Sequence, residues 1–300
     1  MTLPFTGERF TTDCQGEMVY EHWHRYLIAR DQVAGKVVLD IGSGEGYGSH
    51  LLSGAAQSVV GVDLSTEAVN HATGKYASSN LRYVTASCTQ IPLPSQSFDV
   101  IVSFEMIEHI HEQAEFIAEV NRLLKPDGLF IVSSPNRPEY SEKTGYNNEF
   151  HVKELDRAEL KALLDPYWPA QKWFAQRAAF HSMVWPLDAA VDSGRALAPD
   201  GTSAYPAEVY FIVMCSTSAA SVAALPSQLT LVADRENSVY SEWSRTYQEN
   251  ASLHRQIAEL TAASAEHTPH TSPQSPADTS ASAAPLEPWL VRFARRLTGG

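Results

Sequence analysis

The most informative stretch of this chain reads Val37-Val38-Leu39-Asp40-Ile41-Gly42-Ser43-Gly44-Glu45-Gly46-Tyr47-Gly48. It begins as an apolar strand that ends on a carboxylate, and from there a glycine occupies every second position. A second apolar run, residues 59–62, ends on Asp63. Glycines in such a turn let the backbone approach a ligand closely, and an acid after the second strand can accept hydrogen bonds from ribose hydroxyls. The two runs therefore predict a nucleotide-binding βαβ unit.

The spacing of the glycines argues against a dinucleotide. The pattern Gly-x-Gly-x-x-Gly, which cradles a pyrophosphate, fails at Tyr47 when counted from Gly42 and at Ser49 when counted from Gly44. The carboxylate of Asp40 would repel a phosphate but suits a cationic ligand. S-adenosylmethionine (SAM) carries a sulfonium and an ammonium group and no phosphate. We therefore expect SAM at this loop, with an ordinary strand-to-helix turn as the alternative.

Further motifs are similar to those of class I SAM-dependent methyltransferases, and the resemblance spans residues 35–216. Residues 87–94 resemble the loop that contacts adenine in that family, residues 97–104 its fourth strand, and residues 123–128 the turn into its fifth. The resemblance implies an α/β fold, with a Rossmann-like seven-stranded methyltransferase sheet and helices on both of its faces. It also implies SAM as the cofactor.

The same resemblance assigns roles in cofactor binding. Asp63 is expected on the ribose hydroxyls and Leu64 against the adenine ring. Ser87 stands where many relatives carry Asp, and its hydroxyl would hold the adenine amino group less strongly than a carboxylate. The expected SAM-binding residues are Asp40, Gly42, Ser43, Gly44, Gly46, Asp63, Leu64, Ser87, Cys88 and Phe104.

Composition narrows the class of protein. The 300 residues carry a formal net charge of −13, which argues against nucleic acid as a partner because phosphate binding needs clustered Lys and Arg. Cys14, Cys88 and Cys215 lack the spacing of a zinc site, so we expect free thiols in a reducing compartment. The sequence shows neither a hydrophobic signal segment nor an apolar run long enough to cross a bilayer. We therefore expect a cytoplasmic protein.

Apolar runs and helical patterns alternate along the chain. Strands are expected at residues 37–41, 59–63, 81–86, 98–104, 128–134, 170–176 and 209–214, and helices at 47–53, 66–78, 112–124 and 154–165. The alternation of the first five of these strands with helices predicts a parallel sheet with helices on both faces. Residues 35–216 form the expected methyltransferase domain, residues 1–34 a segment that caps the acceptor pocket, and residues 180–206 an insertion or lid.

The chain changes character after Ser216. Residues 236–262 carry apolar side chains at alternating spacings of four and three, which predicts a helix or short coiled coil. This helix either packs on the domain or forms a homodimer. Residues 263–285, rich in Ala, Ser, Thr and Pro, predict a disordered linker. Residues 286–298 predict a basic amphipathic helix that contacts a membrane surface or a protein, unless they form only a charge-balancing tail.

Acidic and imidazole side chains follow the fourth expected strand. Glu105, Glu108 and His109 are spaced so that a helical turn would place all three on one side. Two carboxylates and an imidazole suit Mg²⁺ or Mn²⁺. With His151 the set resembles the metal site of small-RNA 2′-O-methyltransferases, which implies Glu105, Glu108, His109 and His151 as ligands. In the alternative, Glu105 shapes the SAM pocket and His109 packs or acts as a general base. The candidate catalytic residues are Glu108, His109 and His151.

Weaker similarities concern the acceptor. Residues 7–10, 133–136 and 147–155 are similar to segments of bacterial glycan-associated methyltransferases, which implies an O-methyltransferase acting on a sugar or glycan hydroxyl. The alternatives are a small-molecule enzyme of the quinone or polyketide type and a non-enzymatic SAM-binding assembly subunit that recruits partners through residues 236–300. Methylation of RNA 3′ ends through the same residues fits poorly with the acidic charge and the missing basic patch.

Overall fold

The computed structural model describes residues 3, 9–14, 16–179, 184, 188, 197, 205–235 and 237–266. The chain divides into two compact units, Met1–Glu242 and Trp243–Gly300. The predicted basic helix at 286–298 lies outside the described residues, as do most of the predicted insertion at 180–206 and the predicted linker beyond residue 266.

The first unit is built on one mixed sheet. In the described part of the chain, its seven strands are ordered β3-β2-β1-β4-β5-β7-β6. They are β1 Val37–Ile41, β2 Ser58–Asp63, β3 Leu81–Thr85, β4 Phe98–Ser103, β5 Leu124–Pro135, β6 Ala170–Gln176 and β7 Tyr210–Ser216. Strands β1 to β5 pair in parallel, whereas β7 runs antiparallel to both of its neighbours, β5 and β6. The parallel arrangement predicted for the first five strands is therefore confirmed. The direction of β7 was not predicted, because a buried apolar run reads the same in either direction.

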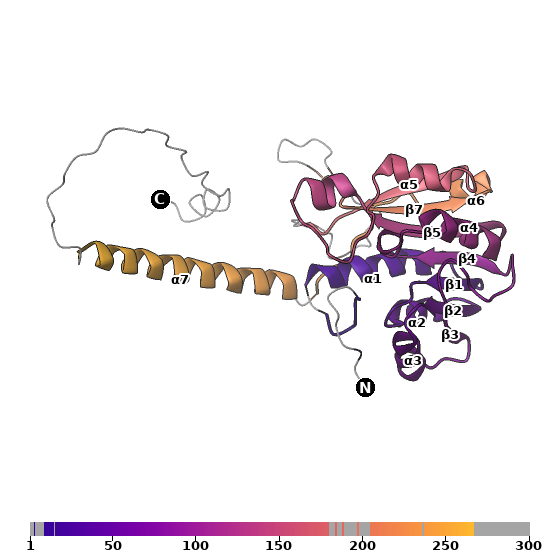
Figure 1. The fold of residues 1–300 in the computed structure, drawn as a ribbon, viewed down its shortest axis with the longest axis horizontal. Coiled ribbons are helices and arrows are strands. Elements are labelled where there is room, and N and C mark those ends of the chain that lie inside the picture. Colours follow the sequence, from indigo (N-terminus) through magenta and orange to yellow (C-terminus); the bar gives the residue numbers. More distant parts are fainter. Residues whose placement is uncertain are drawn as a thin grey trace. The chain divides into compact units, whose positions relative to one another are not determined.

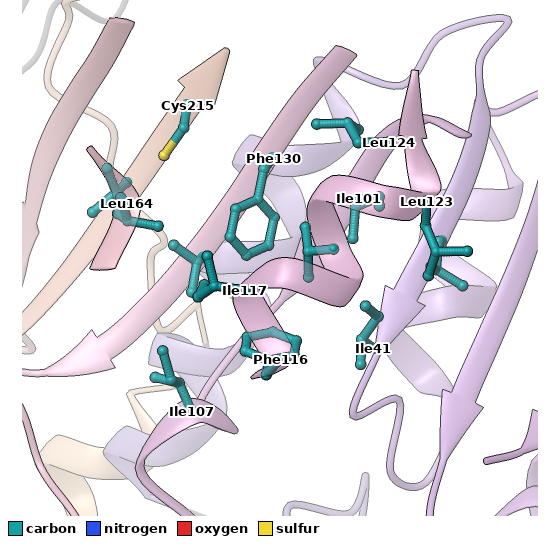
Figure 2. Close-up of a cluster of buried hydrophobic side chains, with 14 of the residues drawn as sticks. Ile41, Ile101, Ile107, Phe116, Ile117, Leu123, Leu124, Phe130, Leu164 and Cys215 are labelled. Atoms are coloured by element: carbon teal, nitrogen blue, oxygen red, sulfur yellow. The ribbon is translucent and has the colours of Figure 1, made fainter. Parts of the chain in front are cut away.

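Helices cover both faces of the sheet (Figure 1). Those described in the first unit are α1 Glu17–Arg30, α2 Tyr47–Ser53, α3 Thr66–Lys75, η1 Ile107–His109, α4 Gln113–Leu123, η2 Pro138–Glu142, α5 Arg157–Leu164 and α6 Ala219–Ala223. One face packs on α4 and α5 through a cluster that includes Phe130 of β5 and Phe116 of α4 (Figure 2). The opposite face packs on α1, α2 and α6. This arrangement confirms the predicted Rossmann-like methyltransferase fold.

The residues that follow the parallel strands gather at one edge of the sheet. Strand β1 leads into the glycine loop at Gly42, β2 ends on Asp63, and Phe104 follows β4. Beyond β5, the amide of Asn136 donates a hydrogen bond to the carbonyl of Val209 at 2.8 Å. Ligands of open α/β sheets bind outside this carboxyl edge, so the fold brings the predicted site residues to the expected place.

The predicted C-terminal helix is present as α7, Ser238–Glu266. It continues four residues past the predicted end at 262, into the segment predicted as a linker. None of the helices in the described ranges has the length and apolar character needed to cross a membrane.

Candidate active site

The glycine loop adopts a backbone that side chains would not tolerate. Gly42, Gly44 and Gly46 have φ angles of +79°, +53° and +97°, in the left-handed region that favours glycine. A Cβ atom on Gly46 would lie 2.6 Å from Cβ of Ala72 and 2.9 Å from the hydroxyl of Tyr83. The loop is therefore packed closely against α3 and β3, and any side chain at position 46 would clash with both.

Asp63 fixes this loop from the end of β2. Its carboxylate accepts hydrogen bonds from the amide of Gly44 at 2.8 Å and from the amide of Ser65 at 2.9 Å. The side chain is 13% exposed, and Nη2 of Arg9 lies 4.0 Å from its Oδ1. The neighbouring Leu64 is 76% exposed, which leaves its side chain open to a ligand. The roles that the resemblance implies for Asp63 at the ribose and for Leu64 at the adenine of SAM stay predictions.

Asp40 has a different environment from the one we expected. Because side chains alternate along a strand, it points to the face covered by α1 and α2. Its carboxylate is fully buried and accepts hydrogen bonds from Ser49 at 2.6 Å and from Tyr26 at 3.2 and 3.3 Å. Burial raises the pKa of this carboxyl to about 7. Asp40 therefore holds two helices at the end of β1, and its hydrogen bonds are already committed within the fold.

The remaining predicted SAM contacts differ in accessibility. Ser43 is buried, and its hydroxyl has no hydrogen-bond partner among the described residues. Ser87 lies in a turn where its hydroxyl is 2.9 Å from that of Thr89. Burial raises the pKa of the Cys88 thiol to about 11, so this half-buried group is neutral. Phe104 is buried in the core. Of these four residues, Ser43 is the one whose buried hydroxyl has a hydrogen bond left to make with a ligand.

Residues 9–14 lie against the glycine loop. The ring of Phe10 stacks on His22 with centroids 4.6 Å apart and meets Tyr47 edge-on at 4.9 Å. The hydroxyl of Thr12 donates to the buried carboxylate of Glu45 at 3.2 Å. Burial lowers the pKa of His22 to about 3, which keeps its ring neutral. This part of the predicted capping segment thus packs beside the glycine loop.

A cluster of one acidic and two imidazole side chains lies where η1 follows β4. One ligand atom from each of Glu108, His109 and His151 lies within 4.8 Å of the others. The loop that carries His151 is held against η1, because the amides of Val152 and Lys153 donate to the carbonyl of Glu108 at 2.9 and 3.1 Å. The structure therefore brings together the three residues predicted as catalytic.

Hydrogen bonds orient both imidazole rings. Nδ1 of His109 lies 3.0 Å from the carbonyl oxygen of Phe150, and Nδ1 of His151 lies 2.6 Å from Oε1 of Glu154. Both partners are acceptors, so each ring donates from Nδ1 and carries its lone pair on Nε2 when neutral. Nε2 of His109 lies 3.9 Å from Oε1 of Glu108. A ring nitrogen fixed in this way is the usual state of a histidine that ligates a metal.

Glu108 is the most unusual member of this group. It is fully buried, and neither carboxylate oxygen has a hydrogen-bond partner among the described residues. Burial raises the pKa of Glu108 well above its ordinary value, and the nearby Glu105 raises it further. A buried carboxylate without partners is costly. The donor set of one carboxylate and two imidazoles fits a divalent cation, which would supply the missing partner.

Glu105 does not join this group, contrary to the prediction from its spacing. Its φ angle is +48°, and the helical turn η1 begins only at Ile107, so the three side chains do not share one helical face. The carboxylate instead accepts from Ser133 at 2.6 Å and lies 3.6 Å from Nη2 of Arg25. Glu105 therefore links β4, β5 and α1.

Sequence reasoning missed several residues around the site. Arg25 is fully buried, donates to Gln176 at 2.7 Å and places its guanidinium 4.5 Å from the ring centroid of Tyr210. Tyr140 stacks on His151 at 5.4 Å and lies 5.7 Å from the ring of Tyr210. These aromatic rings come from η2 and β7. No spacing rule connects them, and their grouping follows only from the pairing of β5 with β7.

Comparisons with known proteins concern the family and the fold of this chain. Residues 39–132 match the family model described as a methyltransferase domain. A probable S-adenosylmethionine-dependent methyltransferase of Mycolicibacterium smegmatis is 39% identical over 166 residues, which cover 54% of this chain and 64% of that protein. A ubiquinone biosynthesis O-methyltransferase of Thiobacillus denitrificans is 34% identical over 117 residues, which cover 38% of this chain and 50% of that protein.

Among solved structures, the fold is similar to that of the candidate methyltransferase in complex with the Haloferax volcanii Trm112 methyltransferase activator. The TM-score is 0.50 at 19% identity, over 66% of this chain and 90% of the other, so the likeness concerns the fold. The matches span less than two thirds of the length of the first curated relatives. Together, these findings show that residues 39–132 are similar to a methyltransferase domain and that the fold is that of a methyltransferase.

Proposed function

We propose that the protein is a SAM-dependent O-methyltransferase that acts on a hydroxyl of a sugar or glycan with the help of a divalent cation. The observation that carries this proposal is the group formed by Glu108, His109 and His151 at the carboxyl edge of the sheet. The glycine loop and Asp63 lie at the same edge, so a bound SAM and an acceptor held by the group would be neighbours.

Three features support SAM as the methyl donor. The left-handed glycine loop admits a ligand against its backbone, and the Asp63 carboxylate is fixed beside it. The buried hydroxyl of Ser43 has no partner in the described part of the chain. The family match covers these same residues. In-line transfer from a sulfonium needs mainly correct positioning, since the leaving group is already good.

The acidic and imidazole group supports a cation. Glu108, His109 and His151 would hold Mg²⁺ or Mn²⁺, and the cation would lower the pKa of a hydroxyl bound to it. The chain's own contribution is to keep both imidazoles oriented through Phe150 and Glu154 and to keep Glu108 away from water. Without a cation, His109 and His151 are the candidate bases that would take the hydroxyl proton.

Aromatic rings beside the group support an acceptor with a ring. Tyr140 stacks on His151, and the rings of Tyr146 and Tyr210 each lie with their centroids 5.7 Å from that of Tyr140. Tyrosines combine an apolar face with a hydroxyl, which suits the faces and hydroxyls of sugars. The second candidate acceptor is a phenolic quinone precursor, which the similarity to ubiquinone biosynthesis O-methyltransferases favours.

We also propose that the protein works in a reducing compartment such as the cytoplasm. Cys14, Cys88 and Cys215 are all free thiols, and burial raises the pKa of Cys88 and Cys215, which keeps both unreactive.

The proposal is tested by transfer of labelled methyl groups from SAM to a panel of sugars, nucleotide sugars, glycolipids and phenols, with and without EDTA. We expect turnover of an acceptor with neighbouring hydroxyls, its loss in EDTA and its return with Mg²⁺. Turnover of a phenol alone would favour the second candidate. SAM binding without turnover of any acceptor would favour the assembly subunit. Turnover that is indifferent to EDTA would remove the cation from the proposal and leave the histidines as bases.

A further inference from the structure

Helix α7 carries a regular pattern of side chains along one side. Its 29 residues run about 43 Å, at the usual rise of an α-helix. Leu253, Ile257 and Leu260 are spaced by four and three residues and are 53%, 59% and 71% exposed. Isolated helices in water are marginal, and most helices are stabilised by packing of an apolar side. We therefore expect this exposed apolar stripe to pack against another helix.

The spacing defines a heptad repeat with positions labelled a to g. Positions a and d lie on one side of the helix and form the seam along which a second helix would pack. The full seam has Trp243, Asn250 and Ile257 at positions a, and Val239, Thr246, Leu253 and Leu260 at positions d. From this pattern we infer that α7 pairs with α7 of a second copy of this chain, as a parallel two-stranded coiled coil. The inference is independent of the methyltransferase function proposed above.

Asn250 argues for two parallel strands in one register. A single Asn at an a position costs stability but specifies a parallel dimer, because the two amides meet only when the strands are aligned. Apolar residues flank it on both sides along the seam, with Trp243 one heptad before and Ile257 one heptad after. A slipped pair would bury each amide against apolar side chains without a partner.

The residues beside the seam agree with this orientation. Glu249 occupies a g position and His254 the e position that follows it, and both are exposed. In a parallel pair, Glu249 faces His254 of the second copy, and the carboxylate can accept a hydrogen bond from the imidazole. An antiparallel pair would bring g positions together, which would set the glutamates at 242 and 249 near each other.

The first test is sedimentation of the full chain at micromolar concentration. We expect a dimer for the wild type and a monomer for Ile257→Glu, which places a charge in the seam. Arg255→Glu introduces the same residue at an f position, on the opposite side, and should remain a dimer. A monomeric wild type, a higher oligomer, or a dimer that Ile257→Glu leaves intact would overturn the inference.

The second test reports orientation and does not depend on a disruptive variant. Under mild oxidation, Leu260→Cys should form a disulfide-linked dimer, because equivalent d positions face each other in a parallel pair. Arg255→Cys should not, and the wild-type chain controls for its native cysteines. Equal cross-linking of both variants, or none for Leu260→Cys in a chain that sediments as a dimer, would exclude the parallel arrangement.

Discussion

Nδ1 of His151 lies 2.6 Å from Oε1 of Glu154, and the other oxygen of that carboxylate accepts from the hydroxyl of Ser141 at 2.5 Å. Through these two hydrogen bonds, Glu154 links the imidazole of His151 to Ser141 in η2. It fixes the imidazole with Nδ1 as donor, which leaves Nε2 as the ligand atom. Glu154 is therefore a positioning residue for the proposed cation site.

Glu154→Ala should weaken binding of Mn²⁺ by about 10- to 100-fold, because the His151 ring loses the partner that orients it. Glu154→Gln keeps a carbonyl acceptor and should recover much of the affinity. Glu149→Gln removes a charge from an exposed position in the same loop and should change little. Calorimetric titration of the three variants measures the effect. Wild-type affinity in Glu154→Ala would show that the contact has no positioning role.

Glu108→Gln should separate stability from activity. Neither carboxylate oxygen of Glu108 has a hydrogen-bond partner among the described residues, so replacement by an amide of the same shape breaks no hydrogen bond, and the variant should melt close to the wild type in EDTA. Activity should fall by at least about 100-fold, because the proposed cation loses its only carboxylate ligand. Glu115→Gln, exposed on α4, is the matched control. Melting curves measure the effect on stability, and methyl-transfer rates measure the effect on activity. A fully active Glu108→Gln would show that Glu108 is not a ligand of the proposed cation.

Asp63→Ala should weaken SAM binding by about tenfold or more, since a hydrogen bond to a charged group contributes about 1.5–3 kcal/mol. The change removes the acceptor proposed for the ribose hydroxyls and also frees the amide of Gly44. Glu67→Ala, exposed in the first turn of α3, serves as the control. Unchanged affinity by calorimetry would remove Asp63 from the cofactor site.

Asp40→Asn should flatten the pH dependence of stability. Burial raises the pKa of Asp40 from 3.8 to about 7, so between these values the carboxyl is protonated in the fold and ionised when unfolded. The free energy of unfolding should therefore fall as pH rises, by up to about 1.4 kcal/mol per pH unit from this group. Urea unfolding at about pH 5 and about pH 7.5 measures this slope. Asp31→Asn, at an exposed position, should keep the wild-type slope, and an unchanged slope in Asp40→Asn would refute the argument.

Local patterns predicted most of the sheet. The predicted runs at 37–41 and 170–176 have the same bounds as β1 and β6. The first run lies between Gly35 and Gly42, and the second begins directly after Pro169. Helix α5 starts at Arg157, three residues later than predicted. Its start is set by a capping box in which Asp156 accepts from the amide of Glu159, a signal that the sequence contains.

The site was harder to predict because its contacts come from distant parts of the chain. Glu108 and His109 were identified from their spacing, but the left-handed backbone at Glu105 breaks the helical face on which that argument relied. The place of Tyr210 beside Tyr140 depends on the direction of β7, which an apolar run does not encode. The burial of Asp40 follows from the alternation along β1, a signal available in the sequence that our electrostatic argument overlooked.

The most direct test of the central claim is a titration of Mn²⁺ into the EDTA-treated full chain, followed by electron paramagnetic resonance. We expect one site per chain, which disappears in Glu108→Gln and persists in Glu115→Gln. Absence of a bound-manganese signal in the wild type, or a signal of equal strength in Glu108→Gln, would contradict a cation centre at Glu108, His109 and His151.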